Sequence, residues 1–420
     1  MATDDVRTRV ATEQTAGPQT RGLQTAGPQT TGPQSAGPLA GVTVVDISTV
    51  VMGPYATQIL GDFGADVIRI EPPFDTARQS PANTGRNPGM APLYMQVNRN
   101  KRSVALNLKD PQGISDLFGI LAGADVLVTN MRAGALDRLG LGYDDVHERF
   151  PHLIYAHAQG FAPESSQGNR PAYDEVIQAV SGLVNLQDRS GDSLQFMPTF
   201  IADKTAALYL LNGILAALYH QLRTGEGQHL TLAMADAMIA VNMVEHMGGD
   251  VFVPAAGDVG NPLSLTPAHA AMRTKDGGAI AAVPYTNDAV RKLLIGAGLD
   301  SDAADPVWDS PVIDRPVFTD GIEKVLAHST TKTTAEWEQY LTANDMPYGV
   351  VVDIADLPDD PYVREVGLIT EMEHPTEGTI RVVANPLHFS QTPTGFYRHA
   401  ERAGASTAEV LGATHVPAHA

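Results

Sequence analysis

The segment GVTVVDISTVVMGPYATQILGDFGADVIRIEPP (residues 41–73) decides the fold of this chain. It begins with a short β-branched run, Gly41–Ser48, which is typical of a buried strand. A Gly-Pro pair then opens a predicted helix that runs to about Phe63, because proline is favourable in a first helical turn. A second strand over Ala65–Pro73 ends at two prolines. Strand, helix and strand at this spacing predict a βαβ unit and a parallel sheet.

The turn that follows the first strand argues against one common use of this fold. It lacks the G-x-G-x-x-G pattern by which dinucleotide-binding proteins hold a pyrophosphate. A plain Rossmann dehydrogenase is therefore not supported. Gly53 lies in this turn, and a residue without a side chain there would let a ligand approach the backbone.

Strands and helices continue to alternate beyond this unit. We expect further strands over Ser103–Leu108, Ala124–Asn130 and His152–Phe161, and a helix over Gly113–Ala122. Lys204–Gly227 reads as a long apolar helix closed by glycine, too interrupted by polar residues to cross a membrane. Ligands of open parallel sheets bind outside the carboxyl ends of the strands, so we expect the site at that edge.

Composition divides the chain into four parts. Residues 1–37 repeat the motif TAGPQT and are rich in Gly, Pro, Gln and Thr, which predicts a disordered tail. Residues 38–235 form the first part of a large domain, and residues 346–420 return to it. Residues 236–345 differ in texture and predict a smaller α+β domain. The fold class is therefore α/β, with a parallel-sheet large domain and a smaller middle domain.

The smaller domain has its own set of local signals. A hairpin is predicted over Ala271–Tyr285, with its turn at Asp-Gly-Gly. Helices are predicted over Asn287–Gly296, Asp314–His328 and Thr334–Asn344. The returning chain begins with the run GVVVDI, which reads as a strand, and a second hairpin follows within residues 369–393.

Composition also limits the function. The 420 residues hold 28 Lys+Arg against 48 Asp+Glu, a net charge of −20, which argues against nucleic acid or an anionic membrane as partner. The chain has no cysteine, which excludes disulfides, thiol catalysis and Cys-ligated metal centres. No apolar run near 18 residues and no apolar signal core are evident, so the cytoplasm is the expected compartment.

Two windows carry candidate chemistry. NRNKRSVALNLKDPQG (Asn98–Gly113) is the most basic window of the chain, and it is either a solvated strand end or a phosphate clamp. PAYDEVIQAVSGLVNLQDRSGDSLQFMPTFIADK (Pro171–Lys204) holds four aspartates among small and apolar residues. A partly desolvated carboxylate is a stronger nucleophile or base than one in water. Asp203, directly before the long helix, is the most interesting of the four, although it could simply cap that helix.

From Pro38 to about Gly412 the chain resembles the family III CoA-transferases, which include formyl-CoA, carnitine and 2-methylacyl-CoA (racemase) members. The matching stretches stand in family order: PLAGVTVVDIS, GPYATQILGDFGADVIRIEPP, NRNKRSVALNLK, ADVLVTNMRAGALDRLGLGY, PAYDEVIQAVSGL, NGILAALYHQLRTGEGQHLTLAMADA and GVVVDIADLPDDPYVRE. The resemblance implies a Rossmann-like large domain built from both chain ends, a small middle domain, and an interlocked homodimer. It implies coenzyme A as a substrate, with no metal and no tightly bound cofactor.

The resemblance also points to CoA-contacting positions. These are Val51, Met52 and Gly53; Leu106, Asn107, Leu108 and Lys109; Asn130, Met131, Arg132 and Arg138; and Pro171, Ala172, Tyr173 and Asp174. As a hypothesis of our own, Lys109, Arg102 and Arg138 hold the phosphates. Formyl-CoA members carry glutamine at the position of Val51, which argues against a formyl or oxalyl substrate here.

The family nucleophile is an aspartate just before the long helix, and this position is Asp203. A loop about a dozen residues earlier often reads Asp-Gly-Pro-Pro in the family, and here Asp192 begins a diverged version, so we give Asp192 no chemical role. The racemase branch pairs the nucleophile position with a histidine, which falls on Tyr173. A tyrosine is a poor base at neutral pH, which favours transfer over racemisation.

The expected reaction moves CoA from an acyl-CoA donor to a carboxylic acid through an aspartyl anhydride and an aspartyl-CoA thioester. Two alternatives stay open. One is an acyl-CoA racemase or isomerase of the same fold, and the other is a CoA-binding protein without turnover. Neither the donor acid nor the acceptor acid has a signature in the sequence.

Overall fold

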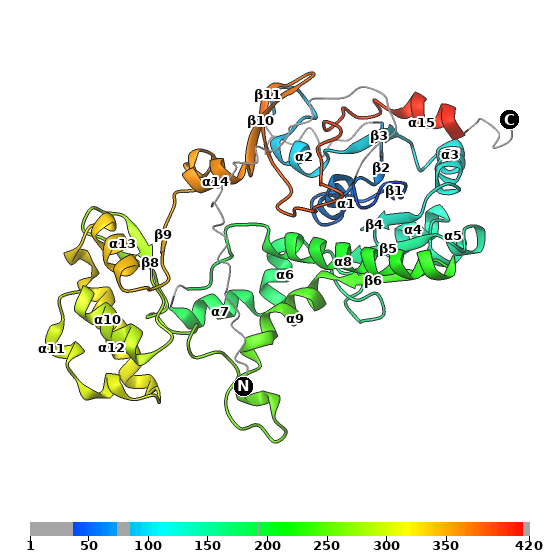
Figure 1. The fold of residues 1–420 in the computed structure, drawn as a ribbon. Helices are drawn as coiled ribbons and strands as arrows, with labels where there is room; N and C mark the ends of the chain where they lie inside the picture. The colour runs from blue at the N-terminus through cyan, green and yellow to red at the C-terminus, as the bar shows by residue number, and fades with distance from the viewer. Residues whose placement is uncertain (1–36, 74–84, 192, 415–420) are drawn as a thin grey trace, which may run out of the picture.

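The structure, a computed structural model, describes residues 37–73, 85–191 and 193–414. The predicted tail over residues 1–37 therefore lies, except for Gly37, outside the described residues. Figure 1 shows a large unit around a sheet and a smaller unit to one side, joined by two connecting segments. The predicted α/β class and the two-part organisation are both visible in this view.

A six-stranded sheet forms the centre of the large unit, and all its described pairings are parallel. The strand order is β3-β2-β1-β4-β5-β6, the order of a Rossmann-like sheet. The chain order reverses between β1 and β4, which makes their carboxyl ends the topological switch point. The strands are β1 (Thr43–Asp46), β2 (Asp66–Glu71), β3 (Lys101–Ala105), β4 (Val126–Thr129), β5 (Ile154–Gln159) and β6 (His229–Ala233).

Helices cover both faces of this sheet because successive strand residues point to opposite sides. Val44 packs into the core with Leu60 and Ile214, whereas the next residue, Val45, packs into the core with Leu117 and Val410. The helices of the large unit are α1 (Met52–Asp62), α2 (Pro92–Val97), α3 (Pro111–Leu121), α4 (Ala133–Leu139), α5 (Tyr143–Arg149), α6 (Asp174–Val180), α7 (Leu183–Ser190), α8 (Ile201–Thr224), α9 (Met234–His246), α14 (Pro361–Val366) and α15 (Thr407–Thr414).

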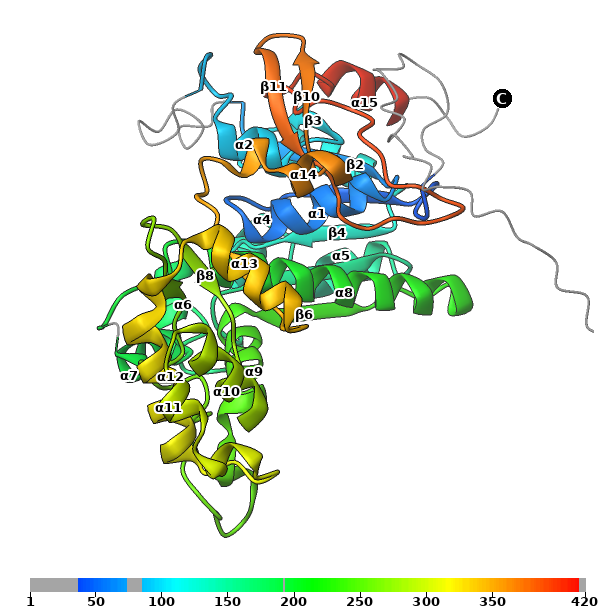
Figure 2. The same ribbon diagram turned by 60° about the vertical axis from the view of Figure 1, so that its left-hand side comes forward.

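The long helix α8 runs along one face of the sheet (Figure 2). By length and composition alone it is apolar enough to cross a membrane, although the sequence pattern predicted otherwise. In the structure it packs against α1, α6 and α9 and against β5 and β6. Such contacts are those of a core helix. Its glycine C-cap, Gly225, has a φ of 76°, so a glycine closes the helix as predicted, but two residues before the predicted end at Gly227.

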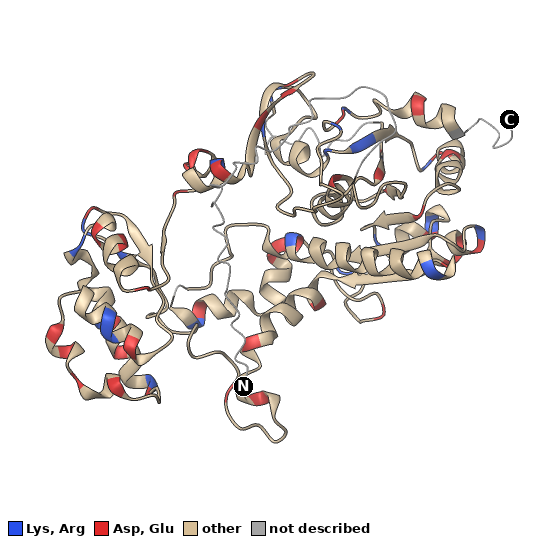
Figure 3. Cartoon of the chain, in the orientation of Figure 1, with Lys and Arg blue, Asp and Glu red and all other residues tan. Residues whose placement is uncertain are grey.

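The smaller unit packs four α-helices against a three-stranded antiparallel sheet of order β7-β8-β9. Its core is built around Trp337, whose indole N–H donates to the carbonyl of Ser329 at 2.8 Å. Its elements are β7 (Met272–Arg273), β8 (Ala279–Ala281), α10 (Asn287–Gly296), α11 (Asp300–Ala303), α12 (Arg315–His328), α13 (Thr334–Ala343) and β9 (Gly349–Val350), with short 3-10 turns at Pro306–Asp309 and Ser329–Thr331. Two further 3-10 turns, Gly248–Val251 after α9 and Leu357–Asp359 before α14, lie on the segments that connect the two units. Several of its helices carry acidic residues, which are red in Figure 3.

One boundary differs from the sequence prediction. The run GVVVDI was expected to begin the return to the large domain at residue 346. Instead Val350 pairs with Ile280 of β8, so β9 completes the smaller sheet before the chain leaves it. A strand of two residues is too short for periodicity to reveal which sheet it joins.

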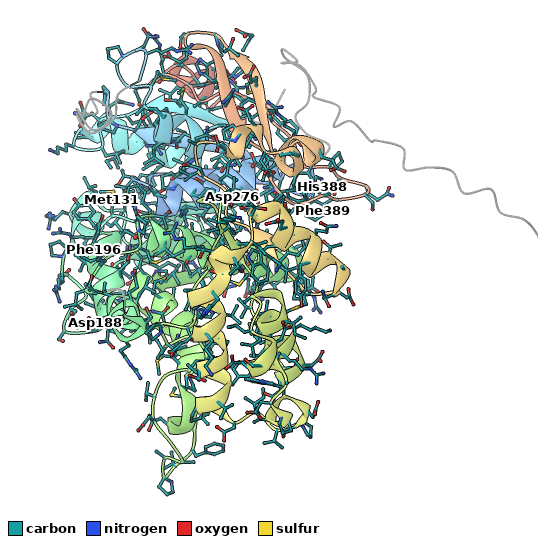
Figure 4. The ribbon with its side chains drawn as sticks, turned by 90° about the vertical axis from the view of Figure 1, so that its left-hand side faces the viewer. Met131, Asp188, Phe196, Asp276, His388 and Phe389 are labelled. Atoms are coloured by element: carbon teal, nitrogen blue, oxygen red, sulfur yellow. The ribbon has the colours of Figure 1, made fainter. Side chains whose placement is uncertain are left out.

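The C-terminal part of the chain builds the far side of the large unit. The hairpin β10 (Ile369–His374) and β11 (Gly378–Val383) leads into a segment that runs beside β3. There the N–H of Asn100 donates to the carbonyl of Arg398 at 2.8 Å, and the N–H of Ser406 donates to Ser103 at 2.9 Å. Phe389, labelled in Figure 4, packs edge-on against Phe63 with 5.7 Å between ring centroids. Both chain ends therefore form the large unit.

Candidate active site

The candidate site lies at the carboxyl ends of β1 and β4, the switch point of the sheet. Asn130, the residue after β4, binds Thr49, which follows β1, through two hydrogen bonds. The N–H of Thr49 donates to Oδ1 at 2.9 Å, and Nδ2 donates to the carbonyl of Thr49 at 2.8 Å. The next residue, Val50, has a φ of 69°, which a β-branched side chain rarely adopts. Backbone strain of this kind is concentrated at functional sites.

The turn after Val50 leads directly into α1 and is closely packed. Val51 and Met52 are each 3% exposed. A Cβ at position 53 would meet the Ser48 hydroxyl at 2.2 Å, while the predicted approach of a ligand to this glycine stays a prediction. Gly53 thus serves the packing of the turn itself. What this turn offers to the site is a backbone donor, the N–H of Met52, at the start of a helix.

Asp203 receives this donor. It lies in the first turn of α8, and its carboxylate accepts a hydrogen bond from the backbone of Met52. Burial and the negative charge of Asp174 raise the pKa of Asp203 to about 6, while the Met52 hydrogen bond acts in the opposite direction. The group is therefore a carboxylate at neutral pH, more basic than an aspartate in water and so a better nucleophile.

The alternative that Asp203 caps the helix is wrong. The helix begins at Ile201 and not at Lys204, so Asp203 lies inside its first turn. The capping acceptor is Asp174, which is 2% exposed and accepts the N–H groups of Ala202 at 2.9 Å and Asp203 at 3.4 Å. It also accepts from Gln178 Nε2 at 3.0 Å. The carboxylate of Asp174 thus serves the start of α8, and its predicted contact with CoA stays a prediction.

The neighbours of Asp174 in the sequence are more accessible. Tyr173 is 68% exposed, Pro171 is exposed, and Ala172 is partly buried. Ala172 packs so tightly against Gly160, the residue after β5, that a Cβ on this glycine would lie 2.3 Å from the alanine methyl. The absence of a side chain at Gly160 thus lets this segment lie across the carboxyl end of the sheet.

An apolar segment over residues 193–200 leads into Asp203. Gln178 holds it, because its Oε1 accepts the N–H of Met197 at 2.8 Å while its Nε2 contacts the carbonyl of Thr199 at 3.4 Å. Phe196, labelled in Figure 4, is 50% exposed. Asp192 of the diverged loop lies outside the described residues. Asp188 lies exposed on α7, and Asp203 is thus the aspartate that combines partial burial with a backbone donor from the turn.

The predicted cations fall into two groups. Arg102 forms a two-pronged ion pair with Asp66 and a second ion pair with Glu409 at 3.4 Å. Asp66 begins β2, so this cluster lies at the amino ends of the strands, opposite the site. The structure therefore argues against a phosphate role for Arg102.

The second group lies at the carboxyl ends. Lys109, Arg132 and Arg138 are exposed, and none of the ion pairs within residues 37–73, 85–191 and 193–414 involves them. Arg132 is the N-cap of α4, and Arg138 lies in its last turn. Cations that hold no carboxylate remain available for an anionic ligand. Of the other predicted contacts, Leu106 is buried, Leu108 and Met131 are partly buried, and Asn107 is exposed beside Lys109.

Sequence reasoning missed two groups of residues behind the site. His157 of β5 places its Nε2 2.7 Å from the carbonyl oxygen of Met131, and burial lowers the pKa of this histidine, so the neutral ring holds the loop after β4. Lys101 and Asp46 form a buried ion pair beneath the turn before α1. A lone histidine or lysine in a strand has no periodic signature, so only the placement of the strands reveals them. Among the described residues, no cluster of three His, Asp or Glu side chains could hold a metal ion.

Comparison with known proteins agrees with this geometry. Residues 39–407 match the family described as CoA-transferase family III. A succinyl-CoA:glutarate CoA-transferase of Homo sapiens is 29% identical over 392 residues, which cover 89% of this chain and 85% of the human protein. A formyl-CoA:oxalate CoA-transferase of Rhodopseudomonas palustris is 30% identical, with 89% and 92% covered.

The fold has relatives among solved structures as well. The crystal structure of a CAIB/BAIF family protein from Brucella suis superimposes with a TM-score of 0.76 over 90% of this chain and 99% of that one, at 23% identity. This likeness concerns the fold, whereas the family match and the curated relatives concern the chemistry. With a Rossmann-like sheet, a small middle unit and a partly buried aspartate at the switch point, the chain belongs to family III of the CoA-transferases and is a transferase enzyme.

Proposed function

We propose that this enzyme moves coenzyme A from an acyl-CoA donor to a carboxylic acid acceptor through covalent intermediates on Asp203. The observation that carries the proposal is the setting of that carboxylate. It is partly buried at the switch point, its pKa is raised to about 6, and it accepts the N–H of Met52 at the start of α1. The curated relatives transfer CoA between carboxylic acids, which supports the same reaction class here.

The reaction would proceed in four acyl transfers. The Asp203 carboxylate attacks the thioester carbonyl of the donor, CoA leaves as the thiolate, and a mixed anhydride remains. The thiolate attacks the aspartyl carbonyl, the donor acid leaves as its carboxylate, and an aspartyl-CoA thioester forms. The acceptor carboxylate then displaces the thiolate from this thioester, giving a second anhydride. Attack of the thiolate on the acceptor carbonyl yields the new acyl-CoA and frees Asp203.

The residues around Asp203 have distinct roles in this scheme. The aspartyl carbonyl carbon is attacked twice, and each attack places negative charge on an oxygen of the Asp203 side chain. The Met52 N–H already donates to that carboxylate, so it is placed to stabilise the oxyanion. Lys109, Arg132 and Arg138 would bind the phosphates of CoA, because guanidinium and ammonium groups are strong donors to phosphate oxygens.

Trapping of the intermediate tests the proposal. The purified enzyme is mixed with a panel of acyl-CoAs, treated with hydroxylamine or borohydride, digested, and analysed by mass spectrometry. We expect modification at Asp203, with none in an Asp203→Asn variant that still binds CoA. Modification at Asp174 or Asp188 would keep the reaction but overturn the assignment of the nucleophile.

An acyl-CoA racemase of the same fold predicts a different result. The substrate's α-hydrogen would exchange with solvent deuterium and no aspartyl adduct would form. Tyr173, at the position where the racemase branch has histidine, is 68% exposed and is a poor base near neutral pH. A protein that binds CoA without turnover predicts neither exchange nor adduct.

We further propose that the enzyme acts as a homodimer in the cytoplasm, with the two subunits interlocked. Both segments that connect the two units expose apolar side chains to solvent in the single chain. The exposed fraction is 60% for Phe252 and 97% for Val253 on one segment, and 53% for Val351 and 82% for Ile354 on the other. Exposed apolar surface of this extent is typical of an interface, and a second copy of the chain would cover it. Size-exclusion chromatography with light scattering would show a single-chain mass if this is wrong.

A further inference from the structure

Four charged side chains are buried together beneath the turn that leads into α1. They are Asp46 of β1, Arg69 and Glu71 of β2, and Lys101 of β3. Lys101 Nζ lies 3.0 Å from Asp46 Oδ2, and the two side chains are 1% and 0% exposed. Arg69 lies 4.0 Å from Asp46 and 3.6 Å from Glu71. The cluster is therefore balanced in charge and shielded from water.

The Asp46–Lys101 pair holds both ends of the turn between Ser48 and Pro54. Asp46 accepts the N–H of Ser48 at 2.9 Å and also its hydroxyl, and it accepts the Thr57 hydroxyl in the next turn of α1 at 2.6 Å. Lys101 Nζ donates to the carbonyl of Pro54 at 2.8 Å. One buried ion pair thus fixes where the turn begins and where the helix starts.

The N–H of Met52 lies between these two fixed points. It is the donor that reaches the Asp203 carboxylate. Asp203 comes from α8 on another part of the chain, so the alignment of this donor depends on how rigidly the turn is held. We propose that Lys101 is a positioning residue for the transfer reaction, which acts through Asp46 and Pro54 to keep the Met52 N–H aimed at Asp203.

The chemistry of the pair supports this role over a purely structural one. Two apolar side chains of similar volume could fill the same space without any cost of desolvation. They could not, however, accept the Ser48 N–H or donate to the Pro54 carbonyl. The pair therefore supplies directed hydrogen bonds to the turn, which packing alone does not provide.

The test uses two variants whose side chains bind opposite ends of the same helix, α1. Lys101→Met breaks the buried pair at the start of α1. Arg99→Met is the matched control at the other end, because Arg99 forms a buried two-pronged ion pair with Asp62 at 3.0 and 2.8 Å. The readout is the pH dependence of acyl-CoA labelling at Asp203, together with thermal unfolding of each variant.

We expect both variants to lower the melting temperature, since each leaves a buried charge without its partner. Labelling at Asp203 is lost as the pH falls, and only Lys101→Met should raise the pH of this loss, its acid limb, by roughly 0.5–1 pH unit. The reason is that a misplaced Met52 N–H no longer favours the ionised form of Asp203. Its labelling rate above that limb should fall ~10-fold or more, as for loss of an oxyanion donor. The Arg99→Met limb should stay at the wild-type position.

Equal shifts in both variants, or no shift in Lys101→Met, would overturn the proposal. If Lys101→Met does not fold, the charge-neutral double variant Asp46→Asn/Lys101→Met replaces it, and the same shift is expected because the methionine thioether cannot donate to the Pro54 carbonyl. The inference rests on Asp203 as the nucleophile. Wild-type enzyme that is never labelled at Asp203 would refute that function, whereas labelled wild type with unshifted variants refutes this inference alone.

Discussion

Two aspartates, 29 residues apart in the chain, meet at the first turn of α8. Asp174 is almost fully enclosed and receives hydrogen bonds from Ala202, Asp203 and Gln178. Asp203 is less enclosed and receives a backbone donor from Met52. The carboxylate with its oxygens fully engaged serves the helix, and the one with fewer donors is free to react. If Asp203 is the nucleophile as proposed, the number of hydrogen-bond donors to each carboxylate separates the two roles better than burial does.

The largest expected effect separates the two by activity. Asp203→Asn should lower CoA transfer by ~10³-fold or more, because the variant has no carboxylate to form the anhydride. Asp174→Asn should keep the aspartyl adduct, since its amide oxygen can still accept the N–H groups of Ala202 and Asp203. Steady-state rates and adduct mass spectra of the two variants measure this difference. Loss of the adduct in Asp174→Asn, with the adduct kept in Asp203→Asn, would make Asp174 the nucleophile in place of Asp203.

The second effect concerns pH. Because the charge of Asp174 contributes to the raised pKa of Asp203, Asp174→Asn should lower that pKa from about 6. Activity that is lost in the wild type as the pH falls through about 6 should then persist to a lower pH, by roughly 1 unit. Glu175→Gln removes a charge whose effect on Asp203 is smaller, so its shift should be smaller. If activity is lost at the same pH in Asp174→Asn as in the wild type, the charge of Asp174 does not affect the pKa of Asp203.

The third effect leaves both aspartates untouched. Arg132→Ala should raise the KM for acyl-CoA roughly 5- to 10-fold by loss of a charged donor to phosphate, without moving the acid limb. Arg102→Ala serves as the control, because its guanidinium is already held by Asp66 and Glu409. Measured KM values should therefore rise in the first variant and stay near wild type in the second. The reverse pattern would place the phosphates at the amino ends of the strands.

The smallest effect is on stability. The pKa of Asp203 is higher in the folded chain than in the unfolded one, so this group favours folding at low pH and the benefit disappears as the pH rises through about 6. At pH 8 the free energy of unfolding of Asp203→Asn should therefore exceed that of the wild type by ~1 kcal/mol after allowance for partial exposure, and its melting temperature should be higher. At pH 4 the two proteins should differ little. Thermal unfolding at both pH values measures this. Destabilisation at pH 8 would indicate that Asp203 is a structural carboxylate.

Much of the fold could be predicted from the pattern of apolar residues and from the prolines and glycines that begin or end an element. The β-branched run before Ser48, the proline that follows Gly53, and the glycine after α8 each produced an element close to its observed bounds. These signals are local, since each depends on residues within a few positions. The boundary at β9 was missed because pairing with β8 is a property of the folded chain.

The site was harder to predict because it depends on contacts between residues that are far apart in the sequence. The basic window suggested one phosphate clamp, but Lys101 lies in a buried network, Arg102 pairs with Asp66, and Lys109 faces the site edge with no ion pair to the described residues. Spacing along a strand does not show which partner a cation meets on the neighbouring strand. In the same way, Asp174 caps a helix that begins 27 positions later, which no local capping pattern could reveal.

The segment that runs beside β3 has a consequence for how the chain folds during synthesis. The strands β1 to β6 leave the ribosome before residues 395–410, and until then β3 is an uncovered sheet edge. An open edge strand is a template for pairing with other chains. Contacts that join Asn100 to Arg398 link residues far apart in the chain, and such distant contacts slow folding. We therefore expect the edge of β3 to stay open to other chains during synthesis until the C-terminal segment arrives.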